Sequence, residues 1–405
     1  MILLSDGKLL QEKDGKLTPM ESAILKKYIE VTKENARRKE WKNSGEGAKF
    51  TGAYHPGVDA TRAAESVSAR VLDVARWGSS TLYTMMINGR SGVYQRFDDA
   101  VEEGVFLSDN EYRYRQLAPD GDKLLLTAEA AGECHLALVQ GEGSRTCEFL
   151  TEGSCYESDP SWSRRLRDVI YYSSVGLEEI VSDGEDHTPV ADEMSLPDMM
   201  REMRYQQAVV RRRGPAVICR MDLVDATVEE ILADEKYNFT HPIEARDGSL
   251  YFIRSPYRLE ERGGGVLTVL KDVVLFPIRL IRALFGFFDF FTMKYSGKTL
   301  NHAGGKAKTK PENQRFVDGN LIDAEKELQK NRESGEEFPG YVPRTHELCR
   351  LVDSRTEVLK KGVLAYELCR EGIVISNGSY LLLLHHDGRE EKLCQAEHVS
   401  RMISR

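Results

Sequence analysis

The feature that most constrains the fold of this chain is a short unit that recurs along it. Four segments place a polar turn before a run of four to six apolar, β-branched or aromatic residues: "YRQLAPDGDKLLLTAE" (114–129), "SDPSWSRRLRDVIYYSS" (158–174), "THPIEARDGSLYFIRS" (240–255) and "YELCREGIVISNGSYLLLLHHDG" (366–388). Asp-Gly and Asn-Gly steps favour two-residue hairpins, because both central positions need positive φ. The apolar runs have the length and composition of buried strands.

A second pattern, strand, polar turn, strand, also recurs. It is found in "CHLALVQGEGSRTCEFLTEG" (134–153), "AVICRMDLVDATVEEILAD" (216–234) and "HELCRLVDSRTEVLKKG" (346–362). Together the two patterns make a four-stranded antiparallel sheet of roughly 40 residues, which is the period of a propeller blade. We therefore predict an all-β fold, a β-propeller of five or six four-stranded antiparallel blades, with helical insertions that include one amphipathic helix.

The segment from 113 to 174 carries a resemblance to a known family. Its residues "LAPDGDKLLLTAE", "HLALVQ" and "CEFLTEGSCYESDPSWS" resemble the repeats of TolB-like β-propellers, in which a Pro-Asp-Gly turn, a strand and a hairpin precede Asp-Pro-x-Trp-Ser at the next blade. The resemblance implies that Trp162 packs between blades. The second copy departs from the pattern, since "SRRLRD" replaces Ser-Pro-Asp-Gly.

The repeats divide the chain into blades and insertions. We place blades at 68–111, 112–155, 156–238, 239–362 and 363–405. The resulting domains are a hairpin over 1–17, a helical or irregular segment over 18–66, blades over 67–258 with a helical insertion at 175–215, an insertion over 259–343 and blades over 344–405. The hairpin either closes the ring or belongs to a sixth blade, and closure would remove two exposed sheet edges.

Two of the insertions have helix signals. In the first, Thr18 and Glu21 have the spacing of a capping box, and the apolar residues that follow predict a helix packed against the outside of the ring. In the second, Ser195 is a candidate cap and Arg211–Arg213 form a cationic helix end. That basic end is either a solvated surface or a site for phosphate or a partner.

The third insertion holds an amphipathic helix, predicted over 265–296 and followed by a charged tether. It is too charged to span a membrane. The apolar residues predicted to contact a membrane or partner are Leu270, Val273, Val274, Leu280, Ile281, Leu284, Phe285, Phe287, Phe288, Phe290 and Phe291. The basic residues predicted to contact an anionic surface are Arg279, Arg282, Lys294, Lys298, Lys306, Lys308 and Lys310.

Such an apolar face must be covered, because each Phe or Leu left in water forgoes roughly 1.5–3 kcal/mol. Three surroundings would bury this apolar face. They are the headgroup region of an anionic membrane, another protein or a second copy of this chain, and the chain's own propeller or N-terminal helix. Aromatic residues, the preceding "GGG" and the lysine-rich exit favour the membrane.

Composition narrows the class of protein. A net charge of −9 argues against nucleic acid as a partner of the whole chain. Seven cysteines without a C-x-x-C pair indicate free thiols and no zinc site. The N-terminus lacks the features of a signal peptide, so we expect a cytoplasmic protein, with peripheral membrane attachment through the helix.

The sequence contains no nucleophile elbow, Walker loop, dinucleotide fingerprint or zincin motif. We therefore predict no catalytic residue, cofactor or metal. The expected function is a non-enzymatic scaffold that binds a partner, a membrane or itself. The alternative is a hydrolase or lyase whose acids and histidines, His241 among them, lie in the axial channel.

Overall fold

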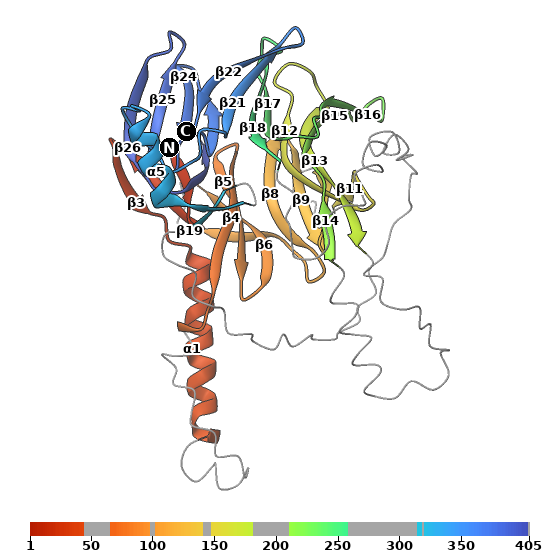
Figure 1. The fold of residues 1–405 in the computed structure, drawn as a ribbon. Helices are drawn as coiled ribbons and strands as arrows, with labels where there is room; N and C mark the ends of the chain where they lie inside the picture. Colours follow the sequence, from red (N-terminus) through yellow and green to blue (C-terminus); the bar gives the residue numbers. More distant parts are fainter. Residues whose placement is uncertain are drawn as a thin grey trace, which may run out of the picture.

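The computed structural model describes residues 1–43, 65–97, 102–140, 147–180, 210–257, 314–317 and 320–403. Strands dominate these residues, so the predicted all-β class is confirmed (Figure 1). The described helices are α1 (Ala23–Asn43) and α5 (Ala324–Glu333). Within the described residues, no helix has the length and apolar character needed to cross a membrane.

Most of the strands belong to four-stranded antiparallel units, numbered here along the chain. Unit 1 contains β4 (Ala69–Trp77), β5 (Ser80–Ile87), β6 (Arg90–Phe97) and β7 (Glu103–Ser108). Unit 2 contains β8 (Arg113–Asp120), β9 (Lys123–Ala130), β10 (Glu133–Gln140) and β11 (Glu148–Phe149). Unit 3 contains β12 (Cys155–Trp162), β13 (Val169–Ile180), β15 (Val217–Asp222) and β16 (Thr227–Leu232).

The remaining units complete the series. Unit 4 contains β17 (Tyr237–Glu244), β18 (Leu250–Pro256), β21 (Glu347–Val352) and β22 (Arg355–Lys361). Unit 5 contains β23 (Ala365–Leu368), β24 (Gly372–Ser376), β25 (Tyr380–His385) and β26 (Glu390–Gln395). Unit 6 contains β27 (Val399–Ile403), β1 (Ile2–Ser5), β2 (Lys8–Lys13) and β3 (Lys16–Pro19).

Unit 6 joins the two ends of the described chain. Ile2 of β1 lies opposite Ile403 of β27 in an antiparallel pair, so the N-terminal hairpin pairs with the last strand. A single parallel pair, Cys134 with Tyr156, links units 2 and 3 into one nine-stranded sheet. That sheet also includes β14 (Val210–Arg213), which extends β13.

The apolar core is distributed between the units. One cluster of buried side chains lies between each unit and the next, and a further cluster lies between units 6 and 1; the pairs that represent them are Leu82 with Leu124, Leu125 with Ile170, Ile218 with Phe252, Ile253 with Ile375, Leu383 with Met402, and Leu4 with Tyr83. Trp162 belongs to the cluster between units 2 and 3, as the family resemblance implied. Successive sheets are therefore held face to face by apolar burial.

The start of α1 differs from the sequence prediction. Thr18 is not its cap, because β3 continues to Pro19 and the helix begins at Ala23. The Ser22 Oγ accepts the Leu25 N–H at 3.2 Å and is the side-chain cap instead. Beyond the first turn the helix extends away from the sheets (Figure 1), so the prediction that it packs along them is wrong.

The described end of the 175–215 insertion also differs from the prediction. Val210–Arg213 form strand β14, not the basic end of a helix. The rest of that predicted helix, including Ser195, lies outside the described residues. The charged stretch before unit 4 resumes contains a hairpin, β19 (Gln314–Val317) with β20 (Asn320–Asp323), and then α5, whose cap is Asp323.

Candidate functional site

All the contact residues predicted on the amphipathic helix, from Leu270 to Lys310, lie outside the described residues. The described chain shows where this segment begins. It follows β18, and the side chain of Tyr257 donates a hydrogen bond to the Arg213 carbonyl at 2.6 Å. Arg213 ends β14, at the return of the 181–209 segment. The two long segments therefore meet the sheets at a shared point.

Strand alternation explains why these segments lie together. The 181–209 segment connects the second and third strands of unit 3, and the 258–313 segment lies in the same connection of unit 4. α1 follows the fourth strand of unit 6. In antiparallel sheets these connections fall at one end of the strands. We call this end the insertion face; α1 and β14 lie along the lower side of Figure 1.

The first turn of α1 is anchored at this face. Glu103 of β7 accepts hydrogen bonds from the Ser22 hydroxyl at 2.8 Å and from the Ile24 N–H at 3.1 Å. Beyond this turn, Tyr28 and Val31 are 41% and 47% exposed. The helix is thus fixed at its root and presents apolar side chains further along.

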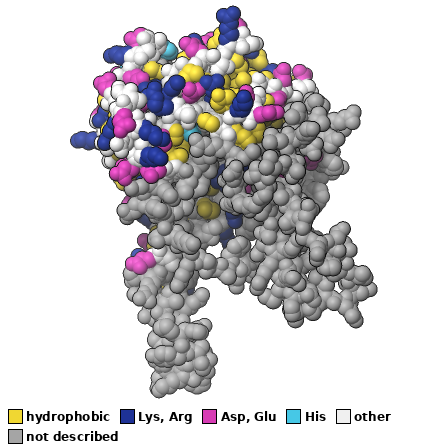
Figure 2. All heavy atoms as spheres, viewed as in Figure 1, with side chains coloured by type: hydrophobic (Ala, Val, Ile, Leu, Met, Phe, Trp, Pro, Cys, Tyr) yellow, Lys and Arg dark blue, Asp and Glu magenta, His cyan; other side chains and the backbone are white. Residues whose placement is uncertain are grey.

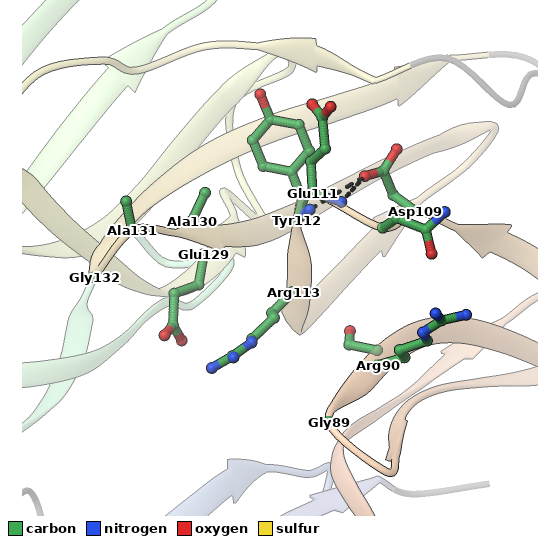
Figure 3. Close-up of a pocket in the computed structure, with 12 residues that line it drawn as sticks. Gly89, Arg90, Asp109, Glu111, Tyr112, Arg113, Glu129, Ala130, Ala131 and Gly132 are labelled. Carbon is green, nitrogen blue, oxygen red and sulfur yellow. Dashed lines mark hydrogen bonds between the residues drawn. The ribbon is translucent and has the colours of Figure 1, made fainter. Parts of the chain in front are cut away.

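A polar cavity of about 300 Å³ opens between units 1 and 2 at the insertion face (Figure 3). Arg90 and Arg113 enter it from β6 and β8, and Glu129 enters it from β9. Asp109 belongs to the connection between the units and accepts the Glu111 N–H at 2.6 Å. The mixed signs of these charges suit a polar contact and give no preference for one ligand charge.

The first strands of neighbouring units contact one another, β4 with β8 and β12 with β17 for example, so they are the innermost strands and surround a common axis. They form a second candidate site. The first strand of four units carries a bulge, at Val71/Asp73, Tyr114/Leu117, Ser158/Ser161 and Thr240/Ile243. Bulges turn side chains out of the regular alternation. Here they place polar side chains against the backbone edge of the neighbouring unit.

These side chains satisfy N–H groups along the axis. Asp73 accepts the Leu117 N–H at 2.8 Å, and Gln116 accepts the Asp159 N–H at 2.8 Å. Asp159 in turn accepts the His241 N–H at 3.2 Å. The same relation thus joins unit 1 to 2, 2 to 3 and 3 to 4. It satisfies backbone donors that the edge of an inner strand would otherwise leave unpaired.

Asp159 and His241 are the most unusual members of this group. Their φ angles are 52° and 56°, in the left-handed region that is costly for residues other than glycine. The His241 Nε2 lies 3.5 Å from an Asp159 carboxylate oxygen, and the buried Nδ1 has no hydrogen-bond partner among the described residues. A proline follows each residue in the sequence, which is the local signal that could have paired them.

Two arginines from the turn between β12 and β13 reach the same region. Arg164 donates to Glu367 of β23 at 3.0 Å, and the Nε of Arg165 lies 3.6 Å from Glu244 of β17. The turn of unit 3 is therefore bonded to both units 4 and 5. This is the physical role of "SRRLRD", the segment that departs from the TolB-like pattern.

Arg401 of β27 completes the axial charges. Its Nε lies 3.4 Å from an Asp73 carboxylate oxygen, and its charge also acts on Glu367. Burial raises the pKa of the Asp73 and Glu367 carboxyls, and the charge of Arg401 opposes the rise in both. The sequence prediction missed Asp73, Gln116 and Arg401, because nothing local distinguishes them. It also missed Asp159, which the proline that follows it does mark.

The bridge between Arg164 and Glu367 can be measured by a double-mutant cycle. We expect R164A and E367Q to show a coupling free energy of about 0.5–1 kcal/mol in urea unfolding, since Arg164 remains partly exposed. The coupling should shrink in 1 M NaCl. A coupling of zero at low salt would show that the bridge does not hold unit 5 to unit 3.

What the axial arrangement does is pair charges. Asp73, Asp159, Glu244 and Glu367 each have a charged or hydrogen-bonding partner among the described residues. No group of three or more His, Cys, Asp or Glu within the described ranges is arranged to hold a metal ion. These hydrogen bonds and ion pairs hold neighbouring sheets together.

A cysteine, a histidine and a glutamate near the insertion face lie in the order found in cysteine nucleophiles activated by a base. The Cys155 Sγ lies 3.6 Å from the His135 Nδ1, and the His135 Nε2 lies 3.7 Å from a Glu133 oxygen. However, Cys155 is buried, and this burial raises the pKa of its thiol while burial lowers the pKa of His135. The thiol therefore stays protonated and is not an activated nucleophile. All seven cysteines are free.

Similarity of this chain to known proteins is found in structure and not in sequence. No protein-family model matches the sequence, and no curated protein matches it. Among solved structures, TolB from Acinetobacter baumannii has a TM-score of 0.41 at 11% identity over 82% of this chain and 56% of TolB. A nidogen/laminin complex has a TM-score of 0.41 at 8% identity over 99% of this chain and 98% of that chain.

An enzyme is also among the similar structures. Oligogalacturonate lyase from Vibrio parahaemolyticus has a TM-score of 0.37 at 10% identity over 78% of this chain and 62% of the lyase. This chain thus spans a little over half of TolB and under two thirds of the lyase. TolB, whose repeats the sequence resembles, is among these similar structures.

Proposed function

We propose that this chain is a six-bladed β-propeller that acts as a non-enzymatic scaffold and attaches to an anionic membrane surface through the 265–296 segment. Units 1 to 6 are the blades, and the hairpin over 1–17 completes the last of them. The 18–66 segment connects unit 6 to unit 1, and the insertions over 175–215 and 259–343 belong to units 3 and 4. The observation that carries the proposal is the arrangement of three long connections at one face.

The insertion face supports this role because it carries connecting segments that are longer than a blade requires. A propeller blade requires only short turns between its strands. Here Tyr257 and Arg213 tie the roots of two long segments together, and Glu103 anchors the root of α1. Insertions that gather on one face of a rigid body are a common way to build a contact surface.

The sequence of the third segment supports the membrane as the contact. At about 100° per residue, Phe287, Phe288 and Phe291 lie outside the arc of the predicted helix that carries its charges. Each lysine that follows contributes about 1 kcal/mol at an anionic surface. On the face of the body seen in Figure 2, acidic and basic side chains are interspersed. The proposal therefore assigns the electrostatic attraction to the lysine-rich exit.

Liposome flotation tests the attachment. With vesicles of phosphatidylcholine and about 30% phosphatidylserine, the full chain should float, and the F287E/F291E variant should lose most of its bound fraction. The loss follows because two buried aromatic contacts are replaced by charges that the surface repels. Binding should also fall steeply as salt rises.

V105E/V224E is the matched control, since it adds the same charge at two exposed apolar positions, one in β7 and one in the turn between β15 and β16. It should float like the wild type, and circular dichroism should be alike for all three proteins. Unchanged flotation of F287E/F291E would refute the attachment. A wild type that fails to float but forms a dimer, which F287E/F291E dissociates in light-scattering measurements, would replace the membrane with a second copy.

A hydrolase or lyase with an axial site is the second candidate. The contact between Asp159 and His241 favours it, together with the His241 Nδ1, which has no hydrogen-bond partner in the described part of the chain. The pairing of the other axial carboxylates favours the scaffold. An enzyme of this kind would require a hydrolytic or eliminating activity that H241N abolishes while the fold is retained.

A further inference from the structure

A second cavity, of about 320 Å³, lies between units 5 and 6, on the side of the sheets opposite the insertion face. Its lining residues are Met1, Glu12, Glu367, Cys369, Glu371, Val374, Leu383 and Leu393. Cys369 and Glu371 belong to the turn between β23 and β24, which is the first turn of its unit. First turns alternate with the insertion-bearing connections, so they lie at the other end of the strands.

The floor of this cavity is apolar. Val374 and Leu383 belong to the buried cluster between units 5 and 6, and Leu393, Met1 and Cys369 pack against that cluster. The cavity is thus an unfilled end of the core between two sheets. An aliphatic group of a few carbon atoms placed there would gain free energy by leaving water.

The remaining lining residues are acidic. Glu12, Glu367 and Glu371 contribute carboxylates, and no Lys, Arg or His side chain is among the lining residues of this cavity. Glu12 accepts the Gly15 N–H at 2.9 Å and lies 3.7 Å from the Met1 ammonium, while Glu367 is bonded to Arg164. Within the described residues Glu371 forms no salt bridge, so its charge is available to a ligand.

We propose that this cavity binds an aliphatic cation, either a lysine or arginine side chain of a partner or a free alkylamine of the same shape. The hydrocarbon stem lies on the apolar floor and the charged head lies among the carboxylates, as long basic side chains do at protein surfaces. The same carboxylates repel an anion. This contact is independent of the insertion face and adds a second binding surface to the scaffold.

Cys369 provides a reporter within the cavity. Its alkylation by iodoacetamide can be followed by peptide mass spectrometry, with Cys147 as the internal reference, because both thiols are half-buried and the other five are buried. At pH 7.5, n-pentylamine should slow the alkylation of Cys369 at least threefold at saturation and leave Cys147 unchanged. The uncharged isostere 1-pentanol should protect Cys369 much less.

Glu371 is the rim residue to change, because it holds no other salt bridge in the described structure. E371Q should raise the pentylamine concentration for half-protection about two- to fivefold. E229Q removes an exposed acid of unit 3 and should change nothing. A capped Gly-Lys-Gly peptide that protects, while its norleucine analogue does not, identifies a partner side chain; protection by the free amine alone identifies a small ligand.

Three outcomes would overturn the proposal. Equal protection by pentanol and pentylamine would show a cavity that takes apolar groups without regard to charge. An equal pentylamine concentration for half-protection in E371Q and wild type would show that the Glu371 charge takes no part in binding. Protection by none of the compounds would show that the cavity does not bind an aliphatic cation.

Discussion

Replacing Arg401 with methionine is expected to lower the free energy of unfolding by about 3 kcal/mol. Arg401 lies 3.4 Å from the Asp73 carboxylate, which is only 4% exposed. Removing one partner of a buried pair costs about 3–5 kcal/mol, because the remaining charge stays buried without its counterion. Since Arg401 itself is 29% exposed, we expect the lower end of that range.

The loss should depend on pH. Burial already raises the pKa of the Asp73 carboxyl, and removing the guanidinium would raise it further. Protonation of Asp73 then relieves the buried charge at low pH. Urea unfolding should therefore show a smaller effect of R401M at pH 5 than at pH 8. Adding D73N to R401M should recover part of the loss at pH 8.

R350M is the matched control for Arg401. Arg350 donates to Glu357 across neighbouring strands at 2.8 Å, but these side chains are 37% and 60% exposed. Exposed pairs contribute about 0–1 kcal/mol, so R350M should have little effect. If R401M costs no more than R350M, the axial pair does not stabilise the contact between the closing strand and unit 1.

The strands were predictable because their signals are local. The "KDGK" stretch of the N-terminal hairpin adopts the expected turn, with φ of 52° at Asp14 and 74° at Gly15. Turn, strand and hairpin each depend on neighbours within a few residues. The error at Thr18 arose because its capping signal is also local. Pairing of β3 with β2 extends the strand over the predicted cap.

The axial site was not predictable, because its contacts join residues far apart in the sequence. Asp159 and His241 are 82 positions apart, and Arg164 and Glu367 are 203 apart. A pattern along one sequence does not assign such partners. Comparison with the TolB-like repeat marked "SRRLRD" as a departure without giving its reason. The predicted contact residues on 265–296 lie outside the described residues, so that part stays a proposal.

Ionisation of Glu157 is expected to have the second large effect on the free energy of unfolding. The charged form of this side chain destabilises the folded protein. This side chain is 2% exposed, its Oε1 accepts the Ser174 hydroxyl at 3.3 Å, and its Oε2 has no partner among the described residues. Burial raises the pKa of Glu157 from 4.5 to about 8. The folded protein therefore holds the proton more tightly than the unfolded chain does.

The stability linked to Glu157 is fully present below pH 4.5 and is lost as the pH rises through about 8. Over the whole interval the loss is on the order of 5 kcal/mol. E157Q cannot ionise, so it should be more stable than wild type at pH 9 and about equal to it at pH 4.5. The quantity to measure is the difference in unfolding free energy between the two proteins across this range, because other titrating groups cancel in it. E229Q, at an exposed position, should give a flat difference. If E157Q also gave a flat difference, Glu157 would ionise as freely in the folded protein as in the unfolded chain, and the space between units 2 and 3 would have to admit water to the carboxylate.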